Sequence, residues 1–333
     1  MAMATEWKLF TPASLLFTFL LVQLMRVTTR RLLPSSIYQF VGEFLCSFQL
    51  VTCVYENGLH LKQYGTAIYA IGLFTLSYGY SLTFDALGNP AAVFERFVKR
   101  KITFANGVLR IIFQVVGGLC AYKYIITIWT RMAPTGAHVQ RLQQVFAGAC
   151  VSHLQVDMMT GMICEACAMF VCRSIAGAGI GGKHYYNTVN AMTTVVVVLT
   201  GLNWTGMNIN PALATATTYN CKGHTLIEHV VVYWIGPFLG VLASIALFHY
   251  VLKDEYTAGE KVVKEIDETG DHVFLRNGVT SNGIHHHPVE NGVKPERNGV
   301  KGGKKGAKAK KTPKGKKGKY KLRRRSGGRV NSG

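Results

Sequence analysis

The stretch Trp204-Thr205-Gly206-Met207-Asn208-Ile209-Asn210-Pro211-Ala212-Leu213 contains an Asn-Pro-Ala triplet that occurs a second time, at Asn89-Pro90-Ala91. Each triplet predicts the start of a helix. Asn is a strong N-cap, because its side-chain oxygen accepts a hydrogen bond from an otherwise unpaired backbone N–H. Pro at the first helical position has a suitable φ and no N–H to lose. Two ordinary surface caps would explain the triplets taken singly, so their place in the chain decides their meaning.

The composition indicates an apolar body with a basic tail. Only 16% of the 333 residues are charged, whereas a soluble domain usually has about 25%. Residues 294–333 hold 17 Lys and Arg against the single acid Glu296, and so carry most of the net charge of +20. The body is therefore predicted to lie in a membrane. The tail, residues 253–333, has few large apolar side chains and is predicted to be disordered.

Residues 1–31 are predicted to be an N-terminal anchor helix with a basic flank. Leu9–Val27 is apolar and long enough to span, and Arg30 and Arg31 follow it. Charge behind the apolar run favours an anchor with its N-terminus outside or lumenal over an interfacial or cleaved segment. Six further spans are predicted: Ser36–Tyr55, Tyr64–Phe84, Phe104–Trp129, Met158–Ala178, Tyr185–Leu202 and Ile227–Leu252. Short-loop basic residues then place the C-terminal tail in the cytoplasm.

The six core spans form a repeat, over about residues 36–130 and 157–252. Glu43 lies 46 positions before Asn89, and Glu165 lies 45 positions before Asn210. Two copies of a three-span unit must insert with opposite topology, which is the inverted repeat of membrane transport folds. The sequence thus predicts an all-α membrane protein in which residues 36–252 form the transport domain.

Two half-helices are predicted at the centre of this domain. Ala91–Val98 and Ala212–Tyr219 are too short to cross a hydrocarbon core of about 30 Å. Inverted symmetry brings their N-termini together, and two positive helix ends at mid-membrane repel cations and protons. The side-chain amides of Asn89 and Asn210 offer donors to a passing neutral molecule.

Further motifs make the resemblance to a known family specific. They are Thr205-Gly206-x-x-x-Asn210-Pro211-Ala212, Tyr233-Trp234-x-Gly236-Pro237 and Phe44-Leu45-x-x-Phe48-Gln49-Leu50. From residue 36 to 252 the chain resembles the aquaporin (major intrinsic protein) family. Cys221, nine positions after Ala212, and Leu213 in place of the usual Arg resemble the unorthodox, or superaquaporin, branch. Two features depart from the pattern: the first box is intact, and Asp85-Ala86-Leu87-Gly88 replaces the usual Ser-Gly-x-His.

This resemblance implies six transmembrane helices plus two re-entrant half-helices, with the anchor as an extra N-terminal helix. The pore motifs are then Asn89, Pro90, Ala91, Asn210, Pro211 and Ala212. The outer constriction carries over to Val198, Met207 and Leu213, with Tyr69 as the candidate aromatic from the second span. Loss of the guanidinium at Leu213 removes five donors and a fixed charge. The Asp that marks glycerol channels is also missing, since Ala214 stands there.

Several other polar residues and cysteines have more than one possible role. Glu43 and Glu165 could relay protons, but the resemblance favours a structural role, in which they accept hydrogen bonds from the backbone that leads into each half-helix. Cys221 could be a redox sensor, a disulfide partner or a packing thiol. Cys164-x-x-Cys167 is predicted to pack within a helix, because no second pair supports a zinc site. The tail is predicted to attract anionic lipid head groups, and it lacks the stacking aromatics of a specific nucleic-acid binder.

The function predicted from the sequence is a passive channel for water, with glycerol and hydrogen peroxide as further candidate permeants. The alternative is a non-conducting membrane scaffold that acts through its basic tail. No nucleophile–base or metal-ligand spacing appears near the pore, so neither an enzyme nor a cofactor is expected. The resemblance implies a homotetramer, and the superaquaporin features favour an intracellular membrane, such as the endoplasmic reticulum or vesicles, over the plasma membrane.

Overall fold

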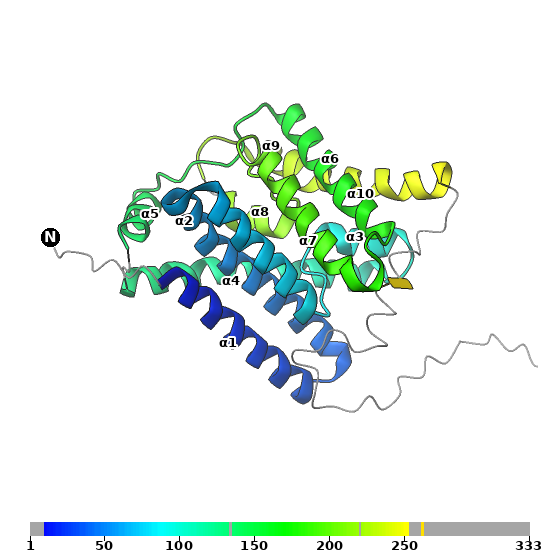
Figure 1. Cartoon of the computed structure of the whole chain (residues 1–333), viewed down its shortest axis with the longest axis horizontal. Coiled ribbons are helices and arrows are strands. Elements are labelled where there is room, and N and C mark those ends of the chain that lie inside the picture. Colours follow the sequence, from blue (N-terminus) through cyan, green and yellow to red (C-terminus); the bar gives the residue numbers. More distant parts are fainter. Residues whose placement is uncertain (1–9, 133–134, 220, 253–260, 263–333) are drawn as a thin grey trace, which may run out of the picture. The chain divides into compact units, whose positions relative to one another are not determined.

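A helix begins at the proline of each Asn-Pro-Ala triplet. These are α3 (Pro90–Val98) and α8 (Pro211–Thr218), both as short as predicted. The structure is a computed structural model that describes residues 10–132, 135–219, 221–252 and 261–262, all within one compact unit. All the regular secondary structure found in these ranges is helical (Figure 1). Nearly all of the predicted tail lies outside the described residues.

The first repeat is built from α2 (Ser35–Thr83), α3 and α4 (Phe104–Met132). α2 contains the predicted span Ser36–Tyr55 and all but the last residue of the predicted span Tyr64–Phe84. A break at Gly65, with a φ of +81°, separates its two arms. Residues with a side chain rarely adopt that φ. Glycine at this position therefore allows the chain to reverse its direction without a separate loop.

The second repeat is built from α6 (Met158–Gly177), α7 (Gly182–Gly201), α8 and a final composite span. That span joins α9 (Leu226–Val230), the π-helical turn η1 (Val231–Ile235), α10 (Gly236–Ala246) and a second π-helical turn, η2 (Leu247–Val251). Five described helical stretches are long and apolar enough to cross a membrane: α1, α2, α4, α6 and residues 226–251. α7 has the predicted length but is less apolar, because polar residues occupy its first turns.

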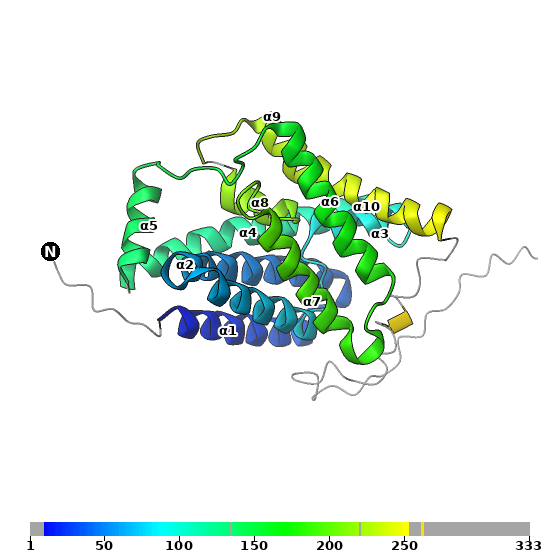
Figure 2. The same cartoon turned by 45° about the horizontal axis from the view of Figure 1, so that its top comes forward.

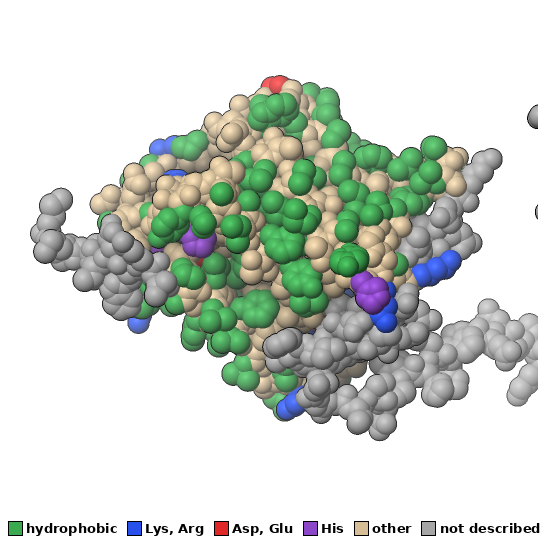
Figure 3. Space-filling view, viewed as in Figure 1, with side chains coloured by type: hydrophobic (Ala, Val, Ile, Leu, Met, Phe, Trp, Pro, Cys, Tyr) green, Lys and Arg blue, Asp and Glu red, His purple; other side chains and the backbone are tan. Residues whose placement is uncertain are grey.

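Glycines let the paired spans of each repeat approach closely. In the first repeat α2 packs on α4, and Gly117 of α4 lies against the backbone of Phe44. In the second repeat α6 packs on α10, where Gly240 lies against the backbone of Ala166. Because lipid supplies no hydrophobic drive between helices, close backbone contact at small residues is a main source of association. On the face drawn in Figure 3, hydrophobic side chains are widely spread and charged ones are few.

The extra helix α1 (Phe10–Leu32) is polar toward the protein and apolar away from it. It lies along α2 (Figure 2), and its buried side chains include Thr11, Thr18, Gln23 and Arg26. Its exposed side chains include Leu16, Phe17, Leu20 and Leu24. This arrangement suits a helix with lipid on its outer side, because apolar side chains are stable in lipid and polar side chains find no hydrogen-bond partner there.

Polar contacts fasten α1 at both ends. At one end Ser14 Oγ donates to Glu56 Oε1 of α2 over 3.1 Å. Glu56 also accepts from Trp129 Nε1 of α4 at 2.8 Å and lies 3.4 Å from His138 Nε2. At the other end Arg30 forms an ion pair with Asp85, 3.2 Å apart. The Glu56 cluster (Ser14, Glu56, Trp129 and His138) thus joins α1 to the first repeat. The sequence alone did not predict this cluster.

The sequence over residues 138–156 predicts an amphipathic external helix. The helix in the structure, α5 (Gly136–Phe146), ends ten residues before Val156. The chain turns at Gly148 and runs on toward Lys222, with which Val151 forms an isolated β-bridge. The backbone groups of this segment are paired with another loop rather than within a helix. Following the predicted topology, we call the end of the bundle that carries α5 the outer end.

We expect Glu56→Ala to lower the free energy of unfolding by about 3 kcal/mol, because it leaves buried partners of a charged group unpaired. Thermal unfolding of the detergent-solubilised protein measures this change. Glu56→Gln, which keeps one acceptor oxygen, should lose less. Thr127→Ala, on the exposed side of α4, is the control and should change little. An equal, small effect of all three substitutions would show that the Glu56 cluster does not stabilise the fold.

Candidate functional site

The two half-helices meet start to start. Asn89 Oδ1 accepts from the N–H of Ala91 at 2.9 Å, and Asn210 Oδ1 accepts from the N–H groups of Ala212 and Leu213 at 3.1 and 3.3 Å. Each side chain therefore caps its own helix, as an N-cap Asn does. The prediction that both triplets are helix starts is confirmed.

The same two asparagines also tie the half-helices together. Asn89 Nδ2 donates to the carbonyl of Ile209 at 2.9 Å, and Asn210 Nδ2 donates to the carbonyl of Gly88 at 2.8 Å. Each bond crosses from one repeat to the other, so the two positive helix ends are held side by side. A primary amide has two N–H donors. One hydrogen on each Asn remains outside this reciprocal pair of bonds.

Glu43 supports the loop that leads into α3. Its Oε2 accepts from the N–H groups of Leu87 and Gly88 at 3.1 and 2.8 Å, and its side chain is fully buried. Gln114 of α4 donates to the same oxygen at 2.7 Å, and Arg110 pairs with Oε1 at 2.6 Å. Arg110, which interrupts an otherwise apolar span, thus supplies a counter-charge inside the protein.

Glu165 supports the loop that leads into α8. Its Oε1 accepts from Thr205 Oγ1 at 2.7 Å and from the N–H of Asn208 at 3.0 Å, and its Oε2 accepts from the N–H of Ile209 at 2.7 Å. Met207 and Ile209 both have a φ of +43°. Such a conformation costs about 1–3 kcal/mol per residue. The buried carboxylate therefore offsets strain in the backbone just before Asn210.

The constriction candidates do not form one cluster. Tyr69, Val198, Met207 and Leu213 are each only 7–8% exposed. Leu213 packs with Val51, Ala121 and Ala216, whereas Met207 packs with Ala168 and Val197. The outer constriction inferred from the family pattern therefore stays a prediction.

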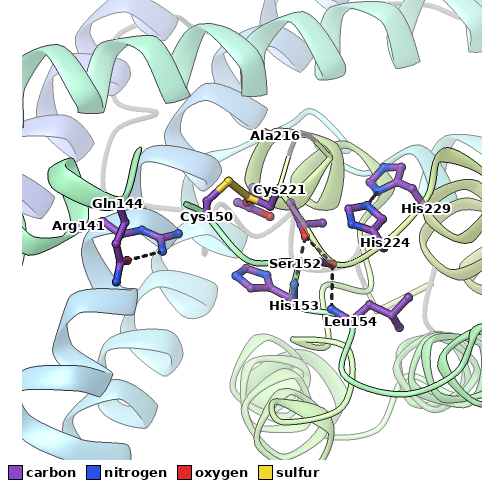
Figure 4. The surroundings of a disulfide bond; sticks show 12 residues. Arg141, Gln144, Cys150, Ser152, His153, Leu154, Ala216, Cys221, His224 and His229 are labelled. Carbon is purple, nitrogen blue, oxygen red and sulfur yellow. Dashed lines mark hydrogen bonds between the residues drawn. A yellow bond between two sulfur atoms is a disulfide. The ribbon is translucent and has the colours of Figure 1, made fainter. Parts of the chain in front are cut away.

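A disulfide joins Cys150 to Cys221 at the outer end (Figure 4). It links the segment after α5 to the segment after α8, and the bridge is reinforced by Ser152 N–H donating to the Lys222 carbonyl at 2.7 Å. Of the alternatives for Cys221, the structure supports a disulfide partner. Cys164 and Cys167 are free. Cys150 could not be identified as the partner from the sequence, because no motif accompanies it.

Comparisons with known proteins give one family. The sequence profile of the family described as "Major intrinsic protein" matches residues 59–250. Aquaporin-11 of Milnesium tardigradum is 29% identical over 255 residues, 76% of this chain and 92% of that protein. Human Aquaporin-11 is 29% identical over 245 residues, 72% of this chain and 88% of that protein. Human putative aquaporin-12A is 27% identical over 232 residues, 69% of this chain and 76% of that protein.

A solved structure is also similar. The aquaglyceroporin from Plasmodium falciparum superposes with a TM-score of 0.49 at 12% identity, covering 66% of this chain and 97% of that one. The relatives named Aquaporin-11 and aquaporin-12 agree with the resemblance to the superaquaporin branch that the sequence indicated.

Glu165→Ala should lower the free energy of unfolding by about 2–4 kcal/mol, because two buried N–H groups and one hydroxyl lose their acceptor. Glu228→Ala is the matched control. That acid also accepts a backbone N–H, from Thr225, but at an exposed helix start, where a cap contributes about 1 kcal/mol. Chemical denaturation in detergent compares the two variants. A smaller loss for Glu165→Ala than for Glu228→Ala would contradict the role assigned to Glu165.

The double variant Cys150→Ser/Cys221→Ser should be less stable by about 2–4 kcal/mol, because the disulfide closes a loop with a sequence separation of 71 residues. A dithiol reductant should cost the wild type a similar amount and leave the double variant unchanged. Cys120→Ser, which removes a free exposed cysteine, controls for thiol chemistry elsewhere. Reductant-insensitive melting of the wild type would contradict this prediction.

Proposed function

The chain belongs to the major intrinsic protein family, and we propose that it is a passive channel for water and for small neutral solutes such as glycerol and hydrogen peroxide. It is an integral multi-pass membrane protein, with residues 36–252 as the proposed channel domain. The observation that carries the proposal is the paired helix starts, tied by Asn89 and Asn210.

Ion exclusion follows from the charge at this point. Each helix start carries about half a positive charge. Two starts side by side in a low-dielectric region oppose the entry of a cation or a hydronium ion. The two buried acids that contact these loops, Glu43 of α2 and Glu165 of α6, bond to backbone and to neighbouring side chains, so they support the loops. The amide hydrogens of the asparagines are the donors proposed to meet a passing neutral molecule.

The permeant is argued from the apolar constriction candidates. Leu213 stands where the family usually has Arg, so the donors and fixed charge of a guanidinium are missing there. Together with Tyr69, Val198 and Met207, it would make a constriction that hydrates poorly. Such a constriction passes water slowly, and it opposes the passage of small uncharged solutes less than a constriction with Arg does. Ala214, in place of the usual Asp, gives no support for a glycerol-specific channel.

We further propose an intracellular membrane, such as the endoplasmic reticulum or vesicles, with the outer end facing the lumen. The Cys150–Cys221 disulfide supports this orientation, since disulfides persist in oxidising compartments. The tail is proposed to be cytoplasmic and to interact with anionic lipids. A homotetramer with one pore per subunit is proposed from family membership.

Osmotic swelling of proteoliposomes tests the channel against the scaffold. Vesicles with the full chain, and vesicles with a chain that lacks Lys253–Gly333, should both swell faster than protein-free vesicles. A scaffold would not speed swelling in either case. Equal rates in the presence and absence of protein would therefore reject the channel.

Leu213→Arg should reduce the permeability to glycerol and hydrogen peroxide relative to water by about fivefold, the effect of about 1 kcal/mol on a barrier. The reason is the restored guanidinium, which binds water and narrows the path. Leu213→Met, of similar volume and without charge, is the control. Stopped-flow light scattering and a peroxide-sensitive dye inside the vesicles report the ratios. An unchanged ratio in Leu213→Arg would remove Leu213 from the constriction.

A further inference from the structure

The segment between α5 and α6 is held tightly against the second half-helix. The disulfide fixes Cys150, the N–H of Ser152 bonds to Lys222 at 2.7 Å, and the N–H of Gln155 bonds to the carbonyl of Trp204 at 2.8 Å. These bonds reach both sides of α8, namely the loop before it and the turn after it. The segment's position relative to the second Asn-Pro-Ala box is therefore fixed at several points.

His153 follows Ser152 on this segment (Figure 4), and its side chain packs against Gly206 in the loop before α8. Its backbone N–H donates to Thr218 Oγ1 of α8 at 3.2 Å. Its ring covers Gly206, where an added Cβ would lie only 3.0 Å from both Cγ and Nδ1 of the imidazole. Gly206, with a φ of +75°, directly precedes Met207. Neither that backbone conformation nor the imidazole leaves room for a side chain here.

The His153 ring keeps its hydrogen-bonding capacity. It is half-buried, and among the described residues no side chain or carbonyl hydrogen-bonds to its nitrogens. The neighbouring histidines differ, since His224 and His229 bond to each other at 3.3 Å and His229 also bonds to Thr215. Burial, with smaller contributions from Arg141 and His224, lowers the pKa of His153 to about 4. At neutral pH the ring is therefore uncharged, with one N–H donor and one acceptor nitrogen.

We infer that His153 is a further selectivity-determining residue at the outer mouth of the pore. Its imidazole narrows the approach to Met207 and exchanges hydrogen bonds with hydroxyl-bearing neutral permeants. It supplies donor and acceptor atoms near a second box that has Leu213 in place of Arg. This inference rests on the proposed channel function and adds a specificity residue that lies outside the repeat motifs.

Three substitutions separate size from hydrogen bonding. His153→Ala removes both the bulk and the polar atoms, and it should raise glycerol permeability relative to water by about fivefold. His153→Phe keeps the bulk without the polar atoms, and it should lower the permeability to water and hydrogen peroxide by a similar factor. His153→Gln keeps a donor and an acceptor and should stay close to the wild type. His184→Ala is the control, since His184 is an exposed histidine in the first turn of α7.

The full-length protein is reconstituted, and stopped-flow rates for water, glycerol and hydrogen peroxide are compared for each variant. Wild-type vesicles no faster than protein-free ones would reject the proposed function itself. The inference alone would be rejected by a conducting wild type for which His153→Ala leaves the glycerol-to-water ratio unchanged and His153→Phe leaves the water and hydrogen peroxide rates unchanged. If His153→Ala does not fold, His153→Phe still decides, because unchanged rates in a folded Phe variant contradict a role for the imidazole nitrogens.

Discussion

Non-helical backbone at mid-membrane must find hydrogen-bond partners inside the protein, and the rest of the structure depends on meeting this requirement. Lipid offers no donor or acceptor, so each unpaired N–H or carbonyl there costs several kcal/mol. Two buried carboxylates, Glu43 and Glu165, accept the N–H groups of the two pore loops. Two asparagine amides donate to carbonyls of the opposite loop. The half-helices can begin in the membrane only because these four side chains are present.

The two repeats meet this requirement with different chemistry. In the first, Arg110 balances the charge of Glu43. In the second, no cation pairs with Glu165 among the described residues. Glu165 instead accepts hydrogen bonds from a strained loop in which two non-glycine residues have a positive φ. The second loop is also fastened from outside by the disulfide and by the segment that carries His153. The two repeats therefore hold their half-helices in different ways, and the second is also held by a covalent bond.

Much of the fold could be predicted because its signals are local. An Asn-Pro start and an acid 45 or 46 positions earlier define the repeat by short-range rules of capping and length. The contacts that were missed join residues far apart in the chain. Glu56 meets Trp129 and His138, and Cys150 meets Cys221, only after the helices pack. The end of α5 at Phe146 was missed for the same reason, since the following residues pair with a distant loop.

The reversed polarity of α1 sets the order in which the protein can be assembled during synthesis. Its polar face leaves the ribosome before any partner exists, because Glu56 follows Ser14 by 42 residues and Trp129 follows Glu56 by 73. The helix can complete its contacts only when α2 and α4 have entered the bilayer. The polar face of α1 must therefore stay away from lipid until the first repeat has been inserted. A fully packed α1 requires that this repeat is already in place.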